Sequence, residues 1–214
     1  MNNLFEFDKK YRERGYRYLC GIDEAGRGPL AGPVVAAAVI FAPDFTVEGL
    51  DDSKKLTEKK REELYPIIKK AALAYGIGQV EADEIDKINI LQATFKAMGL
   101  AVEGLNIQAD YLLVDGRDFP RFFIKGVREK LNGEAVVKGD GKSASIAAAS
   151  VLAKVYRDNI MRKYAEQYPA YDFDRHKGYG TKIHRELIIK NGPCPIHRRS
   201  FLKNILTDYE DSNG

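Results

Sequence analysis

The feature that most constrains the fold is a pair of apolar stretches joined by a short glycine-rich segment. Residues 18–23 (YLCGID) and 33–41 (PVVAAAVIF) have the length and composition typical of buried strands. The segment between them contains GRGPLAG, a sequence typical of a tight turn. The two stretches are therefore predicted to pair as a β-hairpin.

The rest of the chain predicts an α/β domain. Further strands are predicted at residues 74–81, 110–114 and 134–138, and helices at residues 4–14, 56–72, 82–105 and 143–168. No long helix separates the first strands, whereas the later strands alternate with helices. This order indicates a mixed five-stranded sheet flanked by helices. The last predicted helices, near residues 182–190 and 198–206, would form a C-terminal helical cap.

The length and composition of the chain fit a single domain. Its 214 residues are 44% hydrophobic, which is sufficient for a substantial core. We predict one unit over residues 1–214, with a core at about 18–165 and a C-terminal helical segment at 166–214.

Cysteine content and charge limit the compartment and the partners. Only two cysteines occur, which excludes a disulfide framework and favours a reduced, cytoplasmic location. Residues 1–18 are polar, and the longest apolar runs, such as 33–43, are too short to span a bilayer. We therefore expect no signal peptide and no membrane segment. The net charge of +3 permits a nucleic-acid partner without requiring one.

Four acidic residues lie where predicted strands end. Asp23 and Glu24 close the first strand, and Asp115 and Asp140 each follow a later one. Functional groups gather outside the carboxyl ends of strands in α/β sheets, and carboxylates that converge there need a cation. Mg²⁺ and Mn²⁺ prefer oxygen ligands, and two such ions about 3.5–4 Å apart can promote phosphodiester hydrolysis. Each acid alone is more typical of an ordinary turn, but the four together favour a metal site.

Asp23 and Glu24 raise a geometric question because they are adjacent in the chain. Neighbouring side chains of a regular strand point to opposite faces of the sheet. Both carboxylates can serve one site only if the strand ends or twists at Glu24. We expect this because Ala25 and Gly26 follow.

The glycine-rich turn places adaptable backbone beside these acids. Gly26 and Gly28 allow the main chain to approach a ligand closely. Backbone N–H and C=O groups there could contact a ribose 2′-hydroxyl, the group that distinguishes RNA from DNA, and Arg27 could contact a phosphate. The alternative is a simple hairpin turn with an exposed arginine.

Other nucleotide-binding and catalytic motifs fail on spacing. A dinucleotide-binding GxGxxG turn would need its third glycine one residue before Gly32, and the GKS sequence at 141–143 lacks the earlier glycine of a P-loop. Cys194 and His197 have zinc-ligand spacing, but no second pair accompanies them. No GxSxG elbow of a serine hydrolase occurs.

Several ordered blocks resemble the bacterial ribonuclease HII family, which belongs to the type 2 ribonucleases H. The blocks are YLCGIDEAGRGPLAGPVV at residues 18–35, DSKKL at 52–56, VDG at 114–116, VKGD at 137–140, AAASVLAKVYRD at 147–158 and HKGYGTKIH at 176–184. The resemblance spans about residues 18–200, and the blocks occur in the order typical of the family. The first block is highly specific.

The resemblance implies a ribonuclease H-like fold and a defined reaction. The expected enzyme cuts the RNA strand of RNA–DNA hybrids, and cuts 5′ of single ribonucleotides in duplex DNA, leaving 3′-hydroxyl and 5′-phosphate ends. The implied cofactors are two divalent ions, Mg²⁺ or Mn²⁺. The implied catalytic and metal-binding residues are Asp23, Glu24, Asp115 and Asp140. The implied substrate-binding residues are Gly26, Arg27 and Gly28 at the 2′-hydroxyl, Ser53 and Lys54 at a phosphate, and Tyr179 at the RNA-to-DNA junction.

Within this site, Asp23 and Asp115 are expected to contact both ions, and Glu24 and Asp140 to complete one shell each. Two alternatives stay open: a DNA-only nuclease of the same fold, and a non-catalytic module that binds hybrids. Clustered negative charge gives no advantage to a protein that only binds phosphates, which argues against the second alternative. The expected partners are RNA–DNA hybrids and ribonucleotide-containing duplex DNA, bound by a monomer.

Overall fold

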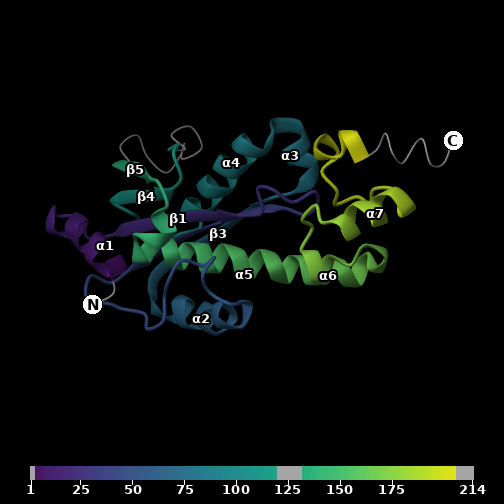
Figure 1. Cartoon of the computed structure of the whole chain (residues 1–214). Helices are drawn as coiled ribbons and strands as arrows, with labels where there is room; N and C mark the ends of the chain where they lie inside the picture. Colours follow the sequence, from purple (N-terminus) through teal and green to yellow (C-terminus); the bar gives the residue numbers. More distant parts are fainter. Residues whose placement is uncertain (1–2, 120–131, 206–214) are drawn as a thin grey trace.

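A mixed five-stranded sheet forms the centre of the molecule in the computed structural model, which describes residues 3–119 and 132–205 (Figure 1). The strands are β1 (Leu19–Ala25), β2 (Val34–Phe41), β3 (Ala72–Val80), β4 (Tyr111–Asp115) and β5 (Asn132–Val136). Their order across the sheet is β3-β2-β1-β4-β5. β2 is antiparallel to both β1 and β3, whereas β4 is parallel to β1 and to β5. The predicted hairpin and the mixed sheet are confirmed.

Helices cover both faces of the sheet (Figure 1). The helices are α1 (Asn3–Glu13), α2 (Glu58–Ala71), α3 (Ala82–Ile88), α4 (Ile90–Glu103), α5 (Ala144–Gln167), α6 (Phe173–His176) and α7 (Lys182–Asn191). Alternate residues of β2 point to opposite faces. Ala36 and Ala38 pack in the core under α4, whereas Ala37 and Val39 pack in the core under α5. Both faces are therefore buried, as the apolar β2 sequence predicts.

The start of α5 lies very close to β1. Its small residues, Ala144 to Ser150 apart from Ile146, are all buried. A Cβ atom added to Gly21 would overlap the backbone of Ser145 and Ile146. Only a glycine in β1 allows this approach, which brings α5 against the strand that carries Asp23.

Several predicted boundaries need correction, among them the strand predicted at residues 134–138, which the structure places at Asn132–Val136. β1 continues through Glu24 to Ala25 and does not end at Glu24. The helix predicted at residues 82–105 is broken at Asn89, which has a φ of 67° and caps α4 by accepting hydrogen bonds from Leu91 N and Gln92 N. The helix predicted near residues 198–206 is described only to residue 205 and contains a 3-10 turn at Arg199–Phe201.

The C-terminal helices α6 and α7 lie beyond the sheet, near the last turns of α5 (Figure 1). Phe173 of α6 packs with Met161 of α5, and both side chains are buried. No helix within residues 3–119 and 132–205 is long and apolar enough to cross a membrane.

Candidate active site

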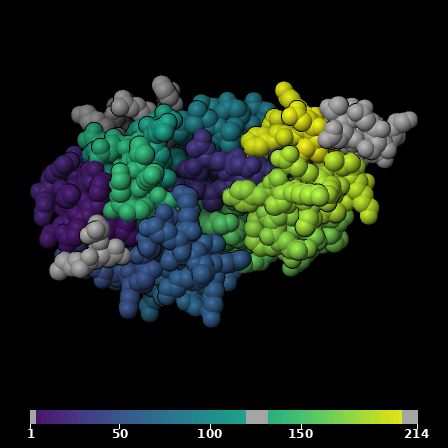
Figure 2. Space-filling view, in the orientation of Figure 1, coloured from purple at the N-terminus to yellow at the C-terminus, as the bar shows by residue number. Residues whose placement is uncertain are grey.

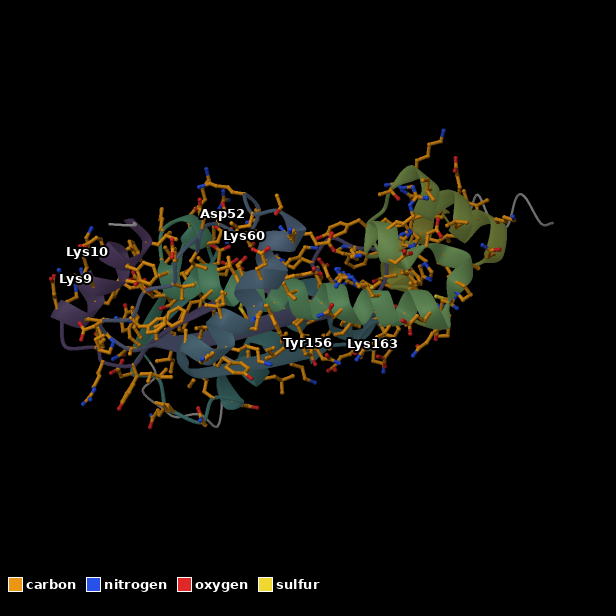
Figure 3. All side chains as sticks on the ribbon, turned by 90° about the horizontal axis from the view of Figure 1, so that it is seen from below. Lys9, Lys10, Asp52, Lys60, Tyr156 and Lys163 are labelled. Atoms are coloured by element: carbon orange, nitrogen blue, oxygen red, sulfur yellow. The ribbon has the colours of Figure 1, made fainter. Side chains whose placement is uncertain are left out.

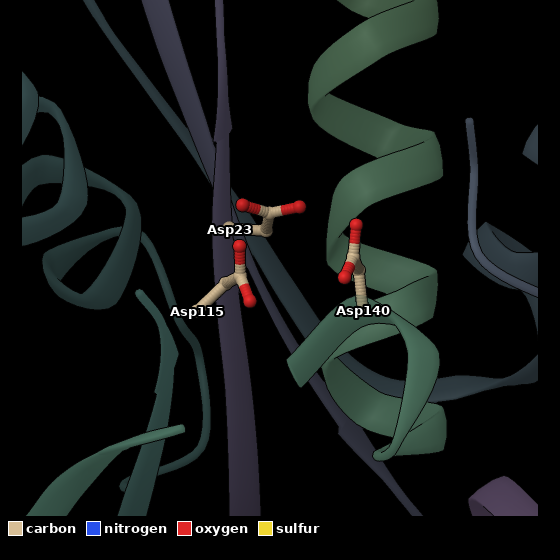
Figure 4. A group of neighbouring side chains, drawn as sticks. All are labelled: Asp23, Asp115 and Asp140. Carbon is tan, nitrogen blue, oxygen red and sulfur yellow. The ribbon is translucent and has the colours of Figure 1, made fainter. Parts of the chain in front are cut away.

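Three aspartates from distant parts of the chain meet at one edge of the sheet (Figure 4). Asp23 lies in β1, and Asp115 is the last residue of its parallel neighbour β4. Asp140 lies in a 3-10 turn, Gly139–Gly141, between β5 and α5. One carboxylate oxygen from each residue lies within 4.8 Å of the others. The convergence predicted for these three acids is present.

Backbone amides and one hydroxyl group orient the three carboxylates. Asp23 Oδ1 accepts a hydrogen bond from Glu24 N at 2.7 Å, and the side chain is also hydrogen-bonded to Ser150 of α5. Asp115 Oδ1 accepts from Gly139 N at 2.6 Å, which ties β4 to the turn that carries Asp140. These bonds fix the direction of the side chains.

Burial and mutual repulsion make the carboxylates costly to ionise together. Asp23 and Asp140 are only 4% and 2% exposed. Burial raises the pKa of Asp23 well above its usual value, and the charges of Glu24 and Asp115 raise it further. The pKa of Asp115 is raised by burial and by Asp140. A divalent cation would remove this repulsion, and a set of carboxylate oxygens suits the hard ions Mg²⁺ and Mn²⁺.

Lys54 supplies one positive charge at this site. Its Nζ lies 2.6 Å from Asp140 Oδ2, while its side chain is 74% exposed. The hydrogen bond with Asp140 raises the pKa of Lys54. A single, largely exposed ammonium group compensates the buried negative charge only in part, so the site retains a deficit of positive charge.

Glu24 stands apart from the three-aspartate group. Neighbouring residues of a regular strand point to opposite faces, yet Asp23 and Glu24 of β1 both line the cavity described below. The Glu24 carboxylate lies 3.5 Å from Arg27 Nη1. Burial raises its pKa, whereas Arg27 opposes that shift, and Asp115 is near enough to contribute to the increase. β1 does not end at Glu24 but continues to Ala25, so of the two expected possibilities only a twist of β1 would let both carboxylates serve one site.

A cavity of about 300 Å³ opens beside the aspartates. Asp23, Glu24 and Asp115 contribute to its wall, together with the sequence-predicted residues Gly26, Arg27, Gly28, Ser53, Lys54 and Tyr179. In the space-filling view, the segment around α2 and the C-terminal helices rise on either side of a hollow (Figure 2). The structure thus brings the predicted substrate residues to the same place as the acids.

The predicted phosphate-contacting and junction residues have distinct surroundings. Ser53 is buried, and its Oγ lies 2.5 Å from Ser150 Oγ, so its hydroxyl holds the loop against α5. Tyr179 is 43% exposed, and the charged groups of Lys154 and Arg157 lie 5.9 and 5.8 Å from its ring centre. The exposed ring is available to a ligand, and the two cations support its position.

Sequence reasoning missed several residues of this site. Ser150, Lys154 and Arg61 also line the cavity. Ser150 and Lys154 lie within the AAASVLAKVYRD block, but their inward direction depends on which face of α5 meets β1. The spacing of i and i+4 on one helix face was the available signal.

The raised pKa values predict how pH affects metal binding. Protons compete with the cation for Asp23 and Asp115, whose pKa values are raised by burial and mutual charge. Mn²⁺ affinity is therefore expected to fall as pH decreases, and to begin falling at a pH above the ordinary carboxylate range near 4. Calorimetry at several pH values, in buffers of different ionisation enthalpy, would measure both the affinity and the protons released. Equal affinity at pH 5 and pH 8 would contradict this electrostatic description.

Residues 20–204 match the family model described as Ribonuclease HII. Ribonuclease HII of Caldicellulosiruptor bescii is 53% identical over 205 residues, which are 96% of this chain and 96% of that protein. Ribonuclease HII of Clostridioides difficile is 56% identical over 200 residues, 94% of this chain and 76% of that protein.

Solved structures show the same fold. Ribonuclease H2 from Pyrococcus horikoshii OT3 has a TM-score of 0.73 and 28% identity, covering 90% of this chain and 98% of that one. Bst-RNase HIII, solved in complex with Mn²⁺, has a TM-score of 0.73 at 15% identity, covering 91% of this chain and 70% of that one. The second likeness concerns the fold alone. The matched family model and the identity of more than 50% over almost the entire chain show that this protein belongs to the ribonuclease HII family.

Proposed function

We propose that this ribonuclease HII hydrolyses the RNA strand of RNA–DNA hybrids and cuts 5′ of single ribonucleotides in duplex DNA, leaving 3′-hydroxyl and 5′-phosphate ends. The observation that carries the proposal is the position of the glycine-rich turn. Asp23 and Asp115 line the same cavity as Gly26, Arg27 and Gly28. A group that senses a ribose can therefore act beside the carboxylates that serve the adjacent phosphodiester.

The three-aspartate group would hold the cofactor, and Glu24, which lines the same cavity, would be a fourth ligand. Two divalent ions, Mg²⁺ or Mn²⁺, would supply activation of water and stabilisation of the leaving oxygen. The carboxylate oxygens of Asp23, Asp115 and Asp140 support the choice of a hard divalent ion. The residues of this chain orient the ligands: Ser150 and Gly139 hold Asp23 and Asp115 through hydrogen bonds.

Gly28 offers a direct test of ribonucleotide sensing. Among the described residues, a Cβ atom added there would have no heavy atom within 4 Å apart from Gly28 itself and its two chain neighbours. Gly28→Ala is therefore expected to fold with an unchanged melting temperature, while its methyl group blocks a substrate that approaches the backbone. We expect kcat/KM on a duplex with one ribonucleotide to fall about a hundredfold, the effect typical of losing about 2.7 kcal/mol. Undiminished cleavage would show that the substrate does not reach this backbone.

Lys54 is expected to contribute a phosphate contact. Its side chain is largely exposed at the mouth of the site. Lys54→Ala should weaken duplex binding and reduce the slope of log affinity against log salt concentration by about one. Lys10→Ala provides the control, because Lys10 lies on α1 near one end of the molecule (Figure 3). If the slope is unchanged in Lys54→Ala, Lys54 makes no phosphate contact and serves only in the ion pair with Asp140.

A cleavage assay tests the proposed function as a whole. Three duplexes of one sequence are compared: all DNA, DNA with one ribonucleotide, and an RNA–DNA hybrid, each with Mg²⁺, with Mn²⁺ and with a chelator. We expect cuts in the second and third duplexes only, at the 5′ side of a ribonucleotide, and none with chelator. Cleavage of the all-DNA duplex would indicate a DNA nuclease of the same fold, and binding without cleavage would indicate a hybrid-binding module.

A further inference from the structure

A buried arginine from the C-terminal segment holds the glycine-rich turn from behind. Arg198 has no exposed surface. Its Nη2 donates to Gly26 O at 2.6 Å, its Nη1 donates to Arg27 O at 3.0 Å and its Nε donates to Gly32 O at 3.0 Å. One rigid guanidinium group therefore binds three carbonyl oxygens of the turn between β1 and β2.

The backbone beside Arg198 is attached to the same turn. Arg198 N donates to Leu30 O at 2.8 Å, and Gly32 N donates to Ile196 O at 2.8 Å. His197 forms an antiparallel bridge with Ala31. A single antiparallel bridge with two backbone hydrogen bonds thus holds the C-terminal segment against the outer part of the turn, and this pairing fixes where the guanidinium group enters.

The carbonyl bonds determine where the turn presents its N–H groups. In a trans peptide the C=O and N–H bonds point in opposite directions, and the described residues contain no cis peptide. Because Gly26 O and Arg27 O point towards Arg198, the N–H groups of Arg27 and Gly28 point away from it. Within residues 3–119 and 132–205, neither N–H donates a hydrogen bond.

Two successive N–H groups that point the same way form a concave site for an electronegative oxygen. Arg27 and Gly28 line the cavity next to Asp23. Gly26 has a φ of 95°, a conformation that favours glycine and permits consecutive carbonyl groups to face one side. The turn is therefore shaped as an oxygen-binding site, and Arg198 occupies its reverse side.

We infer that Arg198 is a positioning residue for ribonucleotide recognition: it orients the peptide groups whose Arg27 and Gly28 N–H bonds bind the ribose or the adjacent phosphate oxygen. This inference rests on the proposed function, because it concerns how that site distinguishes RNA from DNA. Arg198 itself contacts no substrate. It acts through the backbone of the turn, 171 residues away in sequence from Arg27.

The test compares affinities for two duplexes of one sequence, one all DNA and one with a single ribonucleotide, in chelator so that no cleavage occurs. Arg198→Met removes the three donors and retains most of the side-chain volume. We expect the preference for the ribonucleotide duplex to fall about tenfold, which corresponds to one hydrogen bond of about 1.4 kcal/mol. Affinity for the all-DNA duplex should change little.

Arg12→Met is the matched control. Arg12 also donates to backbone carbonyl groups, those of Phe41, Ala42 and Pro43, but it lies on α1. Its loss should lower the melting temperature without changing the preference. Arg198→Lys keeps the charge but loses the planar guanidinium group, so its preference for the ribonucleotide duplex should be intermediate. If Arg198→Met does not fold, the preference of Arg198→Lys provides the test.

The outcomes separate the inference from the function on which it rests. If the wild type neither prefers nor cleaves the ribonucleotide duplex, both the proposed function and the inference about Arg198 are overturned. If the wild type is selective and its folded Arg198 variants keep the same preference for the ribonucleotide duplex, only the inference about Arg198 is overturned. Loss of preference in Arg198→Met together with its retention in Arg12→Met would support it, because general destabilisation would affect both variants.

Discussion

Asp23→Asn is expected to abolish hydrolysis of the RNA strand without destabilising the folded protein. The amide retains the size of the carboxylate and can still accept hydrogen bonds from Glu24 N and from Ser150. It removes the charge that the three-aspartate group needs to hold a divalent ion. We expect cleavage to fall at least about a thousandfold, as for the removal of a group that acts as part of a catalytic unit.

The pKa of Asp23 predicts how pH affects the difference in stability between the wild type and the same variant. Burial and the neighbouring charges raise this pKa in the folded state. The folded wild-type protein therefore binds the proton more tightly than the unfolded chain does, and its metal-free stability decreases as pH rises from about 4 through the raised pKa. Asp23→Asn lacks this loss, so its advantage in melting temperature should be absent near pH 3 and increase with pH.

Added metal should reverse the order of stability. Mg²⁺ or Mn²⁺ stabilises a folded protein that binds it, so the wild type should gain melting temperature where Asp23→Asn gains little. Asp83→Asn is the control, because Asp83 forms an exposed ion pair with Lys87. Its activity and its response to metal should match those of the wild type. Full activity in Asp23→Asn, or a gain in melting temperature with metal equal to that of the wild type, would contradict the assignment of Asp23 to the catalytic site.

Local sequence patterns were sufficient to predict the central part of the fold. The buried run of β2 and the glycine-rich turn predicted the hairpin with β1, and apolar strands followed by acids predicted where Asp115 would lie. Thr57 caps α2 by accepting a hydrogen bond from Lys60 N, and threonine is typical of that position. These features depend on residues within a few positions of one another, which is why local sequence patterns predict them.

The features that sequence reasoning missed depend on contacts between distant segments. β1 continues past Asp23 because Glu24 and Ala25 pair with Ala36 and Val35 of β2. Asp140 reaches the site from a 3-10 turn whose Gly139 N is bound by Asp115. In the sequence, Arg198 is only one of several neighbouring basic residues, such as His197 and Arg199. Only its burial against the turn reveals its role, and no local pattern predicts that burial.

Gly21→Ala is expected to cause the largest loss of stability and to disrupt the site indirectly. Gly21 precedes Asp23 by two residues and lies on the same face of β1, where an added methyl group would overlap the backbone of Ser145 and Ile146. Overlap with a helix backbone cannot be relieved by a change of rotamer. The overpacking should cost at least about 3 kcal/mol, the upper end of the usual range.

The same displacement would separate the active-site groups. If α5 moves away from β1, Ser150 moves away from Asp23, and the turn that carries Asp140 moves with the start of the helix. The variant should therefore have a lower melting temperature and bind Mn²⁺ more weakly, although no metal-binding side chain has changed. Gly28→Ala is the matched control, since it adds the same methyl group where, in the part of the chain that the structure describes, no heavy atom beyond its chain neighbours lies within 4 Å. A Gly21→Ala protein as stable as Gly28→Ala would show that α5 does not determine the position of the aspartates.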